Sequence, residues 1–259
     1  MSTDKTTART GLVVAVDGPS SSGKSTVGAE AARRLRYRFC DTGLLYRAVA
    51  WLAVERGIGA DQTAALVPLA DEVELIADRR GRLRHVEAAG RDVTAEVRGA
   101  AVDRTVSEYS KVAELRAALV PRQRAIAAEG GIIVAGRDIG TVILPNADVK
   151  IYLHASPEER ARRRAAQRKV AAGETAASGI LEDMRRRDAI DSERETAPLR
   201  CADDAIVVET DGNTFEQTVE VVVRTIRAAE AAGGGDRGRF VSSQGNCRRR
   251  IRRWCDIFE

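Results

Sequence analysis

Short apolar runs alternate along this chain with longer segments in which apolar positions recur every three or four residues. The runs at 11–16, 37–40, 131–135, 149–153 and 205–208 are short, which is typical of buried strands. The longer segments between them predict amphipathic helices. Strands and helices taken in turn indicate a parallel sheet with helices on both faces, so the predicted fold class is α/β.

The alternation of predicted strands and helices is interrupted between residues 73 and 94, where short polar and apolar segments are separated by Gly81 and Gly90. Such a pattern is typical of antiparallel hairpins. We therefore predict a small antiparallel insert, about residues 66–108, inside one domain that spans residues 1–234.

Composition narrows the class of protein. The 259 residues carry 42 Lys and Arg against 38 Asp and Glu, so the net charge of +4 does not by itself indicate a nucleic-acid-binding protein. Residues 1–11 lack the apolar run of a signal peptide, and no stretch approaches the roughly 20 apolar residues of a membrane span. We therefore expect a cytoplasmic protein without a membrane partner. The cysteines and histidines lack the spacing of a zinc site.

A phosphate-binding sequence separates the first predicted strand from a helix predicted at 26–35. Residues 18–25 fit the pattern G-x-x-x-x-G-K-[ST] without a mismatch. Glycines at both ends let the backbone wrap closely, so that amide N–H groups point at phosphate oxygens. We expect Lys24 to reach the β- and γ-phosphates and the Ser25 hydroxyl to help hold Mg²⁺. The predicted nucleotide-binding residues are Gly18, Pro19, Ser20, Ser21, Ser22, Gly23, Lys24, Ser25 and Thr26.

Two clusters of polar residues follow predicted strands and are candidates for binding a phosphate acceptor. Residues 41–47, Asp-Thr-Gly-Leu-Leu-Tyr-Arg, lie at the carboxyl end of a strand, where parallel sheets bind ligands. Their Asp-Thr-Gly start is also a common way to cap a helix. Arg137 and Asp138, flanked by glycines, can offer a donor fork beside an acceptor, although a plain surface turn has the same composition.

Two arginine-rich segments are predicted to be helical. Arg187, Asp191 and Arg194 are spaced so that they share one helix face, as the charges of a solvated helix also do. The run 158–169 carries many cations into a loop of small residues, which suits a lid that closes over phosphates or, alternatively, an exposed basic helix. A chain with a phosphate loop favours the first interpretation, because arginines converge on transferring phosphates.

These motifs together resemble the bacterial cytidylate kinase family over about residues 11–228. The matching segments are, in order, 17–26, 41–47, 136–141 and 187–199. The resemblance implies a P-loop kinase fold with a central parallel sheet flanked by helices, an insert that binds the nucleoside monophosphate, and an arginine-rich lid at about 158–180. It further implies a monomeric enzyme that uses ATP and Mg²⁺ to phosphorylate CMP and dCMP.

The resemblance also implies roles for single residues. The acceptor-binding set that it implies is Asp41, Thr42, Arg47, Ser107, Arg116, Arg137, Asp138, Arg187, Asp191 and Arg194. Within this set, Arg137 and Asp138 match the pair that reads the cytosine and phosphate region, and Asp191 matches the contact that admits deoxyribose. The cations expected at the transferring phosphate are Lys24, Arg137, Arg160, Arg163, Arg164 and Arg187.

Two other functions stay open at this point. A different kinase of the same fold would act on UMP or on a small alcohol, and the preference for cytosine comes from the resemblance alone. A nucleotide-dependent switch that binds a partner protein is the second, although the chain lacks the Asn-Lys-x-Asp signature of guanine binding.

Members of the family usually end soon after the last helix, which is predicted here at 214–231, so the segment 235–259 departs from the family pattern. Its arginines follow a glycine linker, which is typical of an unstructured extension or of an incorrectly assigned end of the reading frame. Such a basic tail could also contact nucleic acid or an acidic membrane surface. We expect catalysis to be independent of it.

Overall fold

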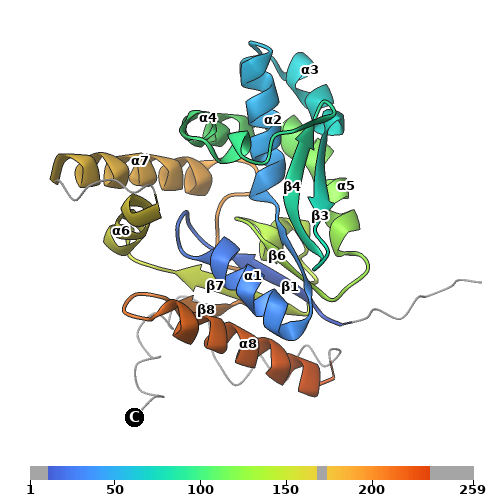
Figure 1. Cartoon of the computed structure of the whole chain (residues 1–259), viewed down its shortest axis with the longest axis vertical. Coiled ribbons are helices and arrows are strands. Elements are labelled where there is room, and N and C mark those ends of the chain that lie inside the picture. The colour runs from blue at the N-terminus through green and yellow to red at the C-terminus, as the bar shows by residue number, and fades with distance from the viewer. Residues whose placement is uncertain (1–10, 168–173, 234–259) are drawn as a thin grey trace, which may run out of the picture.

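A single mixed sheet forms the centre of the protein (Figure 1). The computed structural model describes residues 11–167 and 174–233. Within these ranges the strands lie in the order β3-β4-β2-β6-β1-β7-β8, and β5 pairs with β4. Their bounds are β1 Val13–Asp17, β2 Arg38–Asp41, β3 Val73–Ala77, β4 Arg82–Ala88, β5 Arg91–Asp92, β6 Ile132–Ala135, β7 Val149–His154 and β8 Ile206–Glu209.

The five strands predicted from apolar runs are β1, β2, β6, β7 and β8, and all of them pair in parallel. This confirms the predicted α/β sheet. Every residue of β1 is buried, because helices cover both faces of the strand and leave no polar side to alternate with. The predicted helices at 26–35 and 214–231 are α1 (Lys24–Leu35) and α8 (Phe215–Ala231).

The helices form one layer on each face of the sheet. Val14 and Val16 of β1 pack in the layer of α1 and α8, which lie side by side in Figure 1. Val13 and Ala15 pack on the opposite face, in the layer of α2 and α4. The remaining helical elements are α2 Gly43–Glu55, α3 Thr63–Leu66, η1 Val67–Glu72, η2 Glu96–Arg98, α4 Ala100–Ser110, α5 Ala113–Ala127, η3 Ile139–Ile143, α6 Pro157–Gln167 and α7 Glu174–Glu193.

The predicted hairpin of the insert is present, since β3 and β4 pair antiparallel and β5 adds to β4. It does not form a sheet of its own. β4 also pairs in parallel with β2, through Phe39↔Arg82 and Cys40↔Leu83. This pairing satisfies backbone groups that an edge strand would leave open, and it fixes the insert to the core.

The region predicted to be a lid contains α6 and the first part of α7. The two helices pack on each other through Ala161, Ile180 and Met184. Residues 168–173 of this region and the tail at 235–259 lie outside the described residues, so the prediction for the tail stays a prediction. In the ranges that are described, no helix combines the length and the apolar character needed to cross a bilayer.

Candidate active site

The loop predicted to bind phosphate joins β1 directly to α1. Gly18 and Gly23 have φ angles of 147° and 100°, a region that side chains disfavour. A Cβ atom on Gly18 would lie 2.2 Å from the Leu153 carbonyl oxygen, so only glycine fits there. The loop therefore passes close under β7 and turns its backbone toward the end of the sheet.

Lys24, the first residue of α1, lies under this loop and is buried. Its ammonium group donates to the Pro19 carbonyl at 2.5 Å and to Ser22 Oγ at 3.4 Å. Burial lowers the pKa of Lys24 well below its ordinary value, and the positive charge of Arg137 lowers it further. An anion bound in the loop would supply the negative charge that this lysine lacks.

The oxygen groups next to Lys24 suit a hard divalent cation. The Ser25 hydroxyl donates to Asp41 Oδ2, and Asp41 Oδ1 accepts the Gly43 N–H at 3.0 Å. Hydroxyl and carboxylate oxygens are the ligands that Mg²⁺ takes in proteins, usually together with phosphate oxygens. Ser25 and Asp41 therefore fit the predicted metal position, with Asp41 as a partner that sequence reasoning assigned only to the acceptor.

A cavity of about 200 Å³ opens beside the phosphate loop. All ten residues predicted to bind the acceptor line it, although they come from five separate segments of the chain. Lys24 and Ser25 line the same cavity, so the phosphate loop and the predicted acceptor residues face one space, which we call the acceptor cavity. Val106 and Ser110, which lie outside the predicted motifs, also line it, as do Tyr46 and Gly136 from within them.

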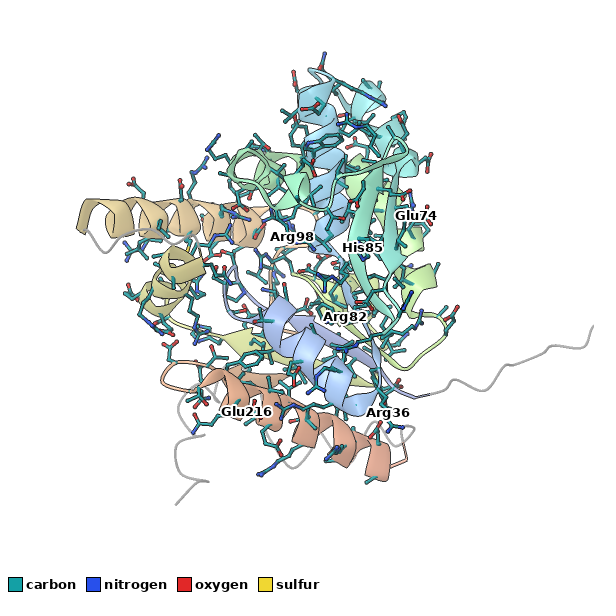
Figure 2. All side chains as sticks on the ribbon, viewed as in Figure 1. Arg36, Glu74, Arg82, His85, Arg98 and Glu216 are labelled. Carbon is teal, nitrogen blue, oxygen red and sulfur yellow. The ribbon has the colours of Figure 1, made fainter. Side chains whose placement is uncertain are left out.

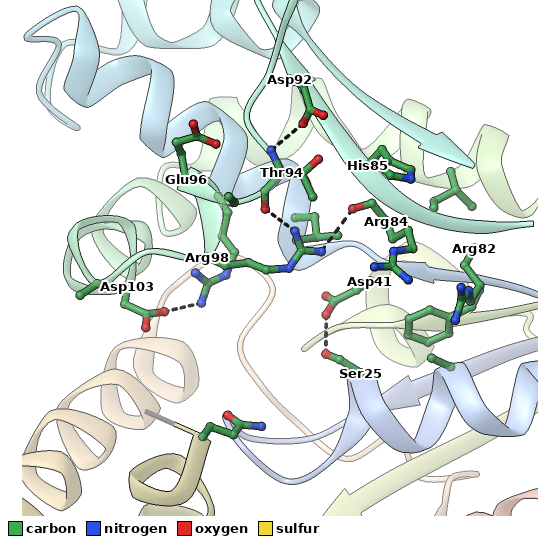
Figure 3. A pocket seen from close by; sticks show the side chains of 18 of the residues that line it. Ser25, Asp41, Arg82, Arg84, His85, Asp92, Thr94, Glu96, Arg98 and Asp103 are labelled. Atoms are coloured by element: carbon green, nitrogen blue, oxygen red, sulfur yellow. Dashed lines mark hydrogen bonds and ion pairs between the residues drawn. The ribbon is translucent and has the colours of Figure 1, made fainter. Parts of the chain in front are cut away.

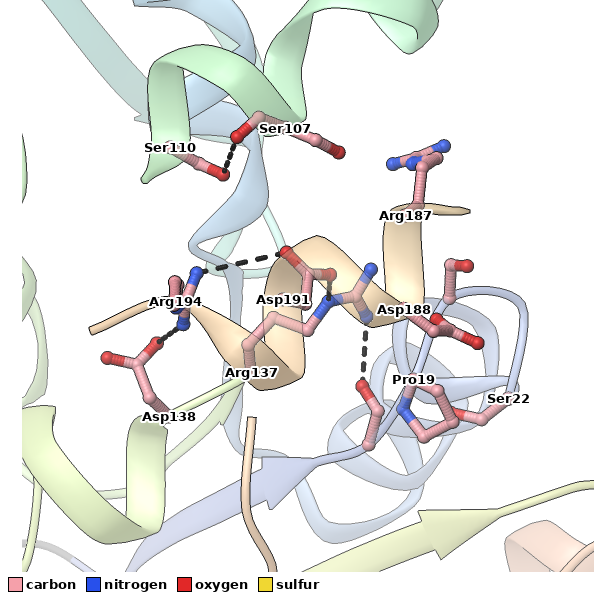
Figure 4. A network of polar contacts seen from close by, with 12 residues as sticks. Pro19, Ser22, Ser107, Ser110, Arg137, Asp138, Arg187, Asp188, Asp191 and Arg194 are labelled. Carbon is pink, nitrogen blue, oxygen red and sulfur yellow. Dashed lines mark hydrogen bonds and ion pairs between the residues drawn. The ribbon is translucent and has the colours of Figure 1, made fainter. Parts of the chain in front are cut away.

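Most cations of this cavity are held by carboxylates. Asp138 accepts from Arg116 at 2.5 Å and from Arg194 at 3.3 Å, and all three side chains are buried. Asp191 accepts from Arg137 Nε at 2.7 Å, and its other oxygen lies 3.8 Å from Arg194 (Figure 4). The arginines are therefore oriented before any ligand arrives.

Arg137 connects this network to the phosphate loop. While Nε faces Asp191, its NH1 donates to the Gly18 carbonyl at 2.9 Å, so the guanidinium spans the space between loop and cavity (Figure 4). The hydroxyl of Thr42 donates to the Ala135 carbonyl at 3.0 Å, directly before the turn that carries Arg137. This geometry places a fixed cation between the two binding regions.

Asp103 of α4 is the main site residue that the sequence did not reveal. Its carboxylate accepts from Arg47 at 2.6 Å, contacts Arg164 and lies 3.8 Å from Arg187 NH1. No motif surrounds it, and it meets these arginines only because α4 packs beside α2 and α7. Burial, followed by the charges of Arg137 and Arg47, lowers the pKa of Arg187 to about 10. Arg187 Nε is buried and has no hydrogen-bond acceptor within the described part of the chain.

The three lid arginines point to different places. Arg160 donates to the Ser20 carbonyl of the phosphate loop at 3.3 Å and to Asp188 at 2.5 Å. Arg164 reaches Asp103 and lines the acceptor cavity. Arg163 instead donates to the Thr210 carbonyl at 2.7 Å and to Thr210 Oγ1 at 2.8 Å, at the end of β8. The contacts of Arg163 therefore fasten the lid to the sheet.

A larger open cavity of about 1500 Å³ lies between the insert and the phosphate loop (Figure 3). It shares Ser25, Asp41, Arg47 and Arg164 with the acceptor cavity, so the two spaces adjoin. Arg82, His85 and Arg98 of the insert line it, and Figure 2 shows where these three side chains lie in the whole molecule. Five arginines and four acidic residues line this larger cavity, so its charges are mixed.

Comparison with known proteins agrees with this site. The family model for cytidylate kinase matches residues 14–228. The cytidylate kinase of Bacillus licheniformis is 41% identical over 217 residues, which are 83% of this chain and 96% of the relative. That of Geobacter sulfurreducens is 42% identical over 227 residues, 88% and 97% of the two chains. That of Nocardia farcinica is 42% identical over 226 residues, 86% and 97%.

Among solved structures, a shikimate kinase from Acinetobacter baumannii in complex with shikimate matches with 14% identity and a TM-score of 0.40, covering 85% of this chain and 95% of its own. Likeness at that level adds nothing to the assignment, which follows from the sequence matches. The family model covers most of the chain and includes every residue that lines the two cavities. The resemblance first drawn from four short motifs is thereby confirmed, and the chain belongs to the cytidylate kinase family.

Proposed function

We propose that this kinase transfers the γ-phosphate of ATP to CMP or dCMP, giving CDP or dCDP. The observation that carries the proposal is the single cavity in which Lys24 and Ser25 meet all ten predicted acceptor residues. Donor and acceptor phosphates bound there would lie next to each other, so a reaction between two substrates becomes a reaction within one complex.

On the donor side, the phosphate loop and Lys24 would hold the phosphates of ATP. Ser25 and Asp41 would hold Mg²⁺, which in such sites neutralises the charge that develops on phosphate oxygens. Lys24 now donates to a loop carbonyl and a hydroxyl, which are neutral acceptors. A phosphate oxygen is a stronger acceptor and would take their place.

During transfer the enzyme has little covalent chemistry to perform. Arg137, fixed between Gly18 and Asp191, is placed to contact phosphates on both sides. Arg187 has an unused buried donor, and Arg160 already touches the phosphate loop. Cations held in position stabilise the charge spread over the moving phosphoryl group, because they need no rearrangement at the moment of reaction.

Recognition of the nucleoside would fall to the far side of the cavity. Ser107, Arg116 and Asp138 offer a hydroxyl, a cation and a carboxylate, which suit the polar edge of cytosine. Asp191, buried and oriented by Arg137, would accept from a ribose or deoxyribose hydroxyl. A carboxylate that needs one sugar hydroxyl accommodates both CMP and dCMP.

The experiment that tests the proposal is a coupled assay of ADP release with ATP and Mg²⁺. CMP, dCMP, UMP, AMP and shikimate are supplied in parallel. We expect turnover with CMP and dCMP well above UMP, and none with AMP or shikimate. Turnover with another acceptor alone would keep the kinase and replace the substrate. Nucleotide binding without turnover of any acceptor would favour the alternative function, a nucleotide-dependent switch that binds a partner protein.

A further inference from the structure

Asp17, the last residue of β1, is a buried carboxylate to which the proposed mechanism gives no task. Each of its oxygens accepts one backbone N–H group from successive residues of a neighbouring turn. Ile139 donates to Oδ1 at 2.8 Å, and Gly140 donates to Oδ2 at 2.7 Å. Hydrogen bonds to an ionised acceptor are about twice as strong as neutral ones, so this pair of contacts holds the turn firmly.

The turn held by Asp17 is the one that carries Arg137 and Asp138. It is attached to the end of β1 at three consecutive residues. The Gly136 N–H donates to the Val16 carbonyl at 3.0 Å, Asp17 accepts the two amides, and Arg137 donates to the Gly18 carbonyl at 2.9 Å. The strand that leads into the phosphate loop therefore also fixes the pair predicted to read the acceptor.

The packing around Gly140 allows its amide to approach Asp17 closely. A Cβ atom at this position would lie 3.3 Å from Asp17 Oδ2 and 3.1 Å from Cδ of Lys150. Both contacts are tight, so a larger residue at 140 must displace the turn or the carboxylate. The absence of a side chain at 140 is thus part of the same attachment.

We propose that Asp17 is a positioning residue for the acceptor: it sets the place of Arg137 and Asp138 relative to the phosphate loop by holding their turn through two amides. The inference rests on the proposed function, because it concerns the same acceptor site. Asp17 acts through the turn and contacts neither substrate. Its loss therefore changes acceptor binding more than ATP binding, although Asp17 directly precedes the phosphate loop in sequence.

The ionisation of Asp17 supplies a readout that a merely structural role would not move. Burial raises the pKa of Asp17 to about 6, nearby Asp138 adds to the rise, and the two amides and Lys24 oppose it. Tyr152 of β7 and Lys150 beside Gly140 complete its ionisable surroundings. A protonated carboxyl group accepts hydrogen bonds less well, so the attachment weakens as the pH falls through about 6.

The test compares Asp17→Asn with Asp148→Asn in the coupled assay. Asp148 is a matched control, because its carboxylate accepts the Val13 N–H at 2.8 Å at the opposite end of β1. At pH 7.5 we expect Asp17→Asn to raise the acceptor KM about tenfold, since one amide loses its acceptor. The KM for ATP should change much less, and Asp148→Asn should change neither.

The pH dependence sharpens the test. The acceptor phosphate itself ionises near pH 6, but this affects the wild type and the variant equally. We therefore expect the acceptor KM of Asp17→Asn, divided by that of the wild type, to decrease from pH 7.5 to pH 5.5. The inference would be overturned if this ratio stayed constant with pH, or if Asp17→Asn raised the KM for ATP as much as the KM for the acceptor. A wild-type acceptor KM in folded Asp17→Asn would also overturn it.

A second variant covers the case in which Asp17→Asn does not fold. Gly140→Ala keeps the carboxylate and moves the amide, so it should raise the acceptor KM in the same direction by a smaller factor. An unchanged acceptor KM in Gly140→Ala contradicts the inference. If the wild-type enzyme itself does not act on CMP, the proposed function falls and the inference falls with it.

Discussion

The phosphate loop and the acceptor cavity hold their positive charges in different ways. Lys24 of the phosphate loop faces a carbonyl and a hydroxyl, and burial disfavours its charge. The arginines of the acceptor cavity face Asp103, Asp138 and Asp191. The hydrogen-bond acceptors of Lys24 are neutral, and carboxylates such as Asp41 and Asp17 act on it only at longer range, whereas the arginines of the second region are paired directly with carboxylates.

The difference suits the two ligands of the proposed function. A triphosphate with a metal ion would bring enough charge to stabilise a buried lysine whose hydrogen-bond acceptors are neutral. A monophosphate is a smaller anion, and its binding depends more on hydrogen-bond donors in fixed positions than on unpaired positive charge. Carboxylates supply that geometry, because they hold each guanidinium in one orientation, and they also weaken binding by competing for its donors.

The largest effect is expected at Lys24. Lys24→Ala should lower kcat by about 10³-fold, because one preorganised donor to the transferring charge is lost. The fold should persist, since removing this amine takes no partner from a buried carboxylate. Lys111→Ala, which breaks a surface pair with Glu108, is the matched control. Turnover like that of the wild type in Lys24→Ala would show that the phosphate loop does not act as assigned.

A second large effect is expected at Asp138, and it concerns stability as well as binding. Asp138→Asn removes the charge that Arg116 and Arg194 share in a buried site. Because buried cations are left unpaired, the variant should lower the free energy of unfolding by about 3 kcal/mol. Unfolding in urea measures this loss. Glu72→Gln, which breaks the exposed pair with Arg56, should change stability little. Equal losses in the two variants would mean that the acceptor cavity is not charge-balanced in the way described.

The smallest effect is expected at Asp103, where removal of a site carboxylate should strengthen the binding of CMP. Asp103→Asn frees Arg47 and Arg187 from a competing carboxylate, so CMP should bind about fivefold more tightly. Isothermal titration at two salt concentrations measures this, and the gain should shrink in high salt. Weaker binding in the variant would instead mean that Asp103 mainly orients the arginines. Asp183→Asn, at an exposed pair with Arg186, serves as the control.

Much of the fold could be predicted from the sequence. Strands buried on both faces, such as β1 and β6, appear as unbroken apolar runs, and α8 begins with a capping box at Thr214 and Gln217 that agrees with its predicted start. The joining of β4 to β2 could not be predicted, because strand pairing depends on which edges meet in space. Hairpin patterns specify only the local partner.

The sequence by itself determined the phosphate loop, because eight consecutive residues carry all of its chemistry and its shape depends on two glycines. It also predicted a set of acceptor residues, through motifs that resemble those of a known family. Only the tertiary structure decided which charges neutralise each other. Asp103 meets Arg47 and Arg164, and Asp17 meets the amides of the Arg137 turn, across separations of 56, 61 and about 120 residues. Contacts over such distances are set by the packing of helices and strands, which no local pattern encodes.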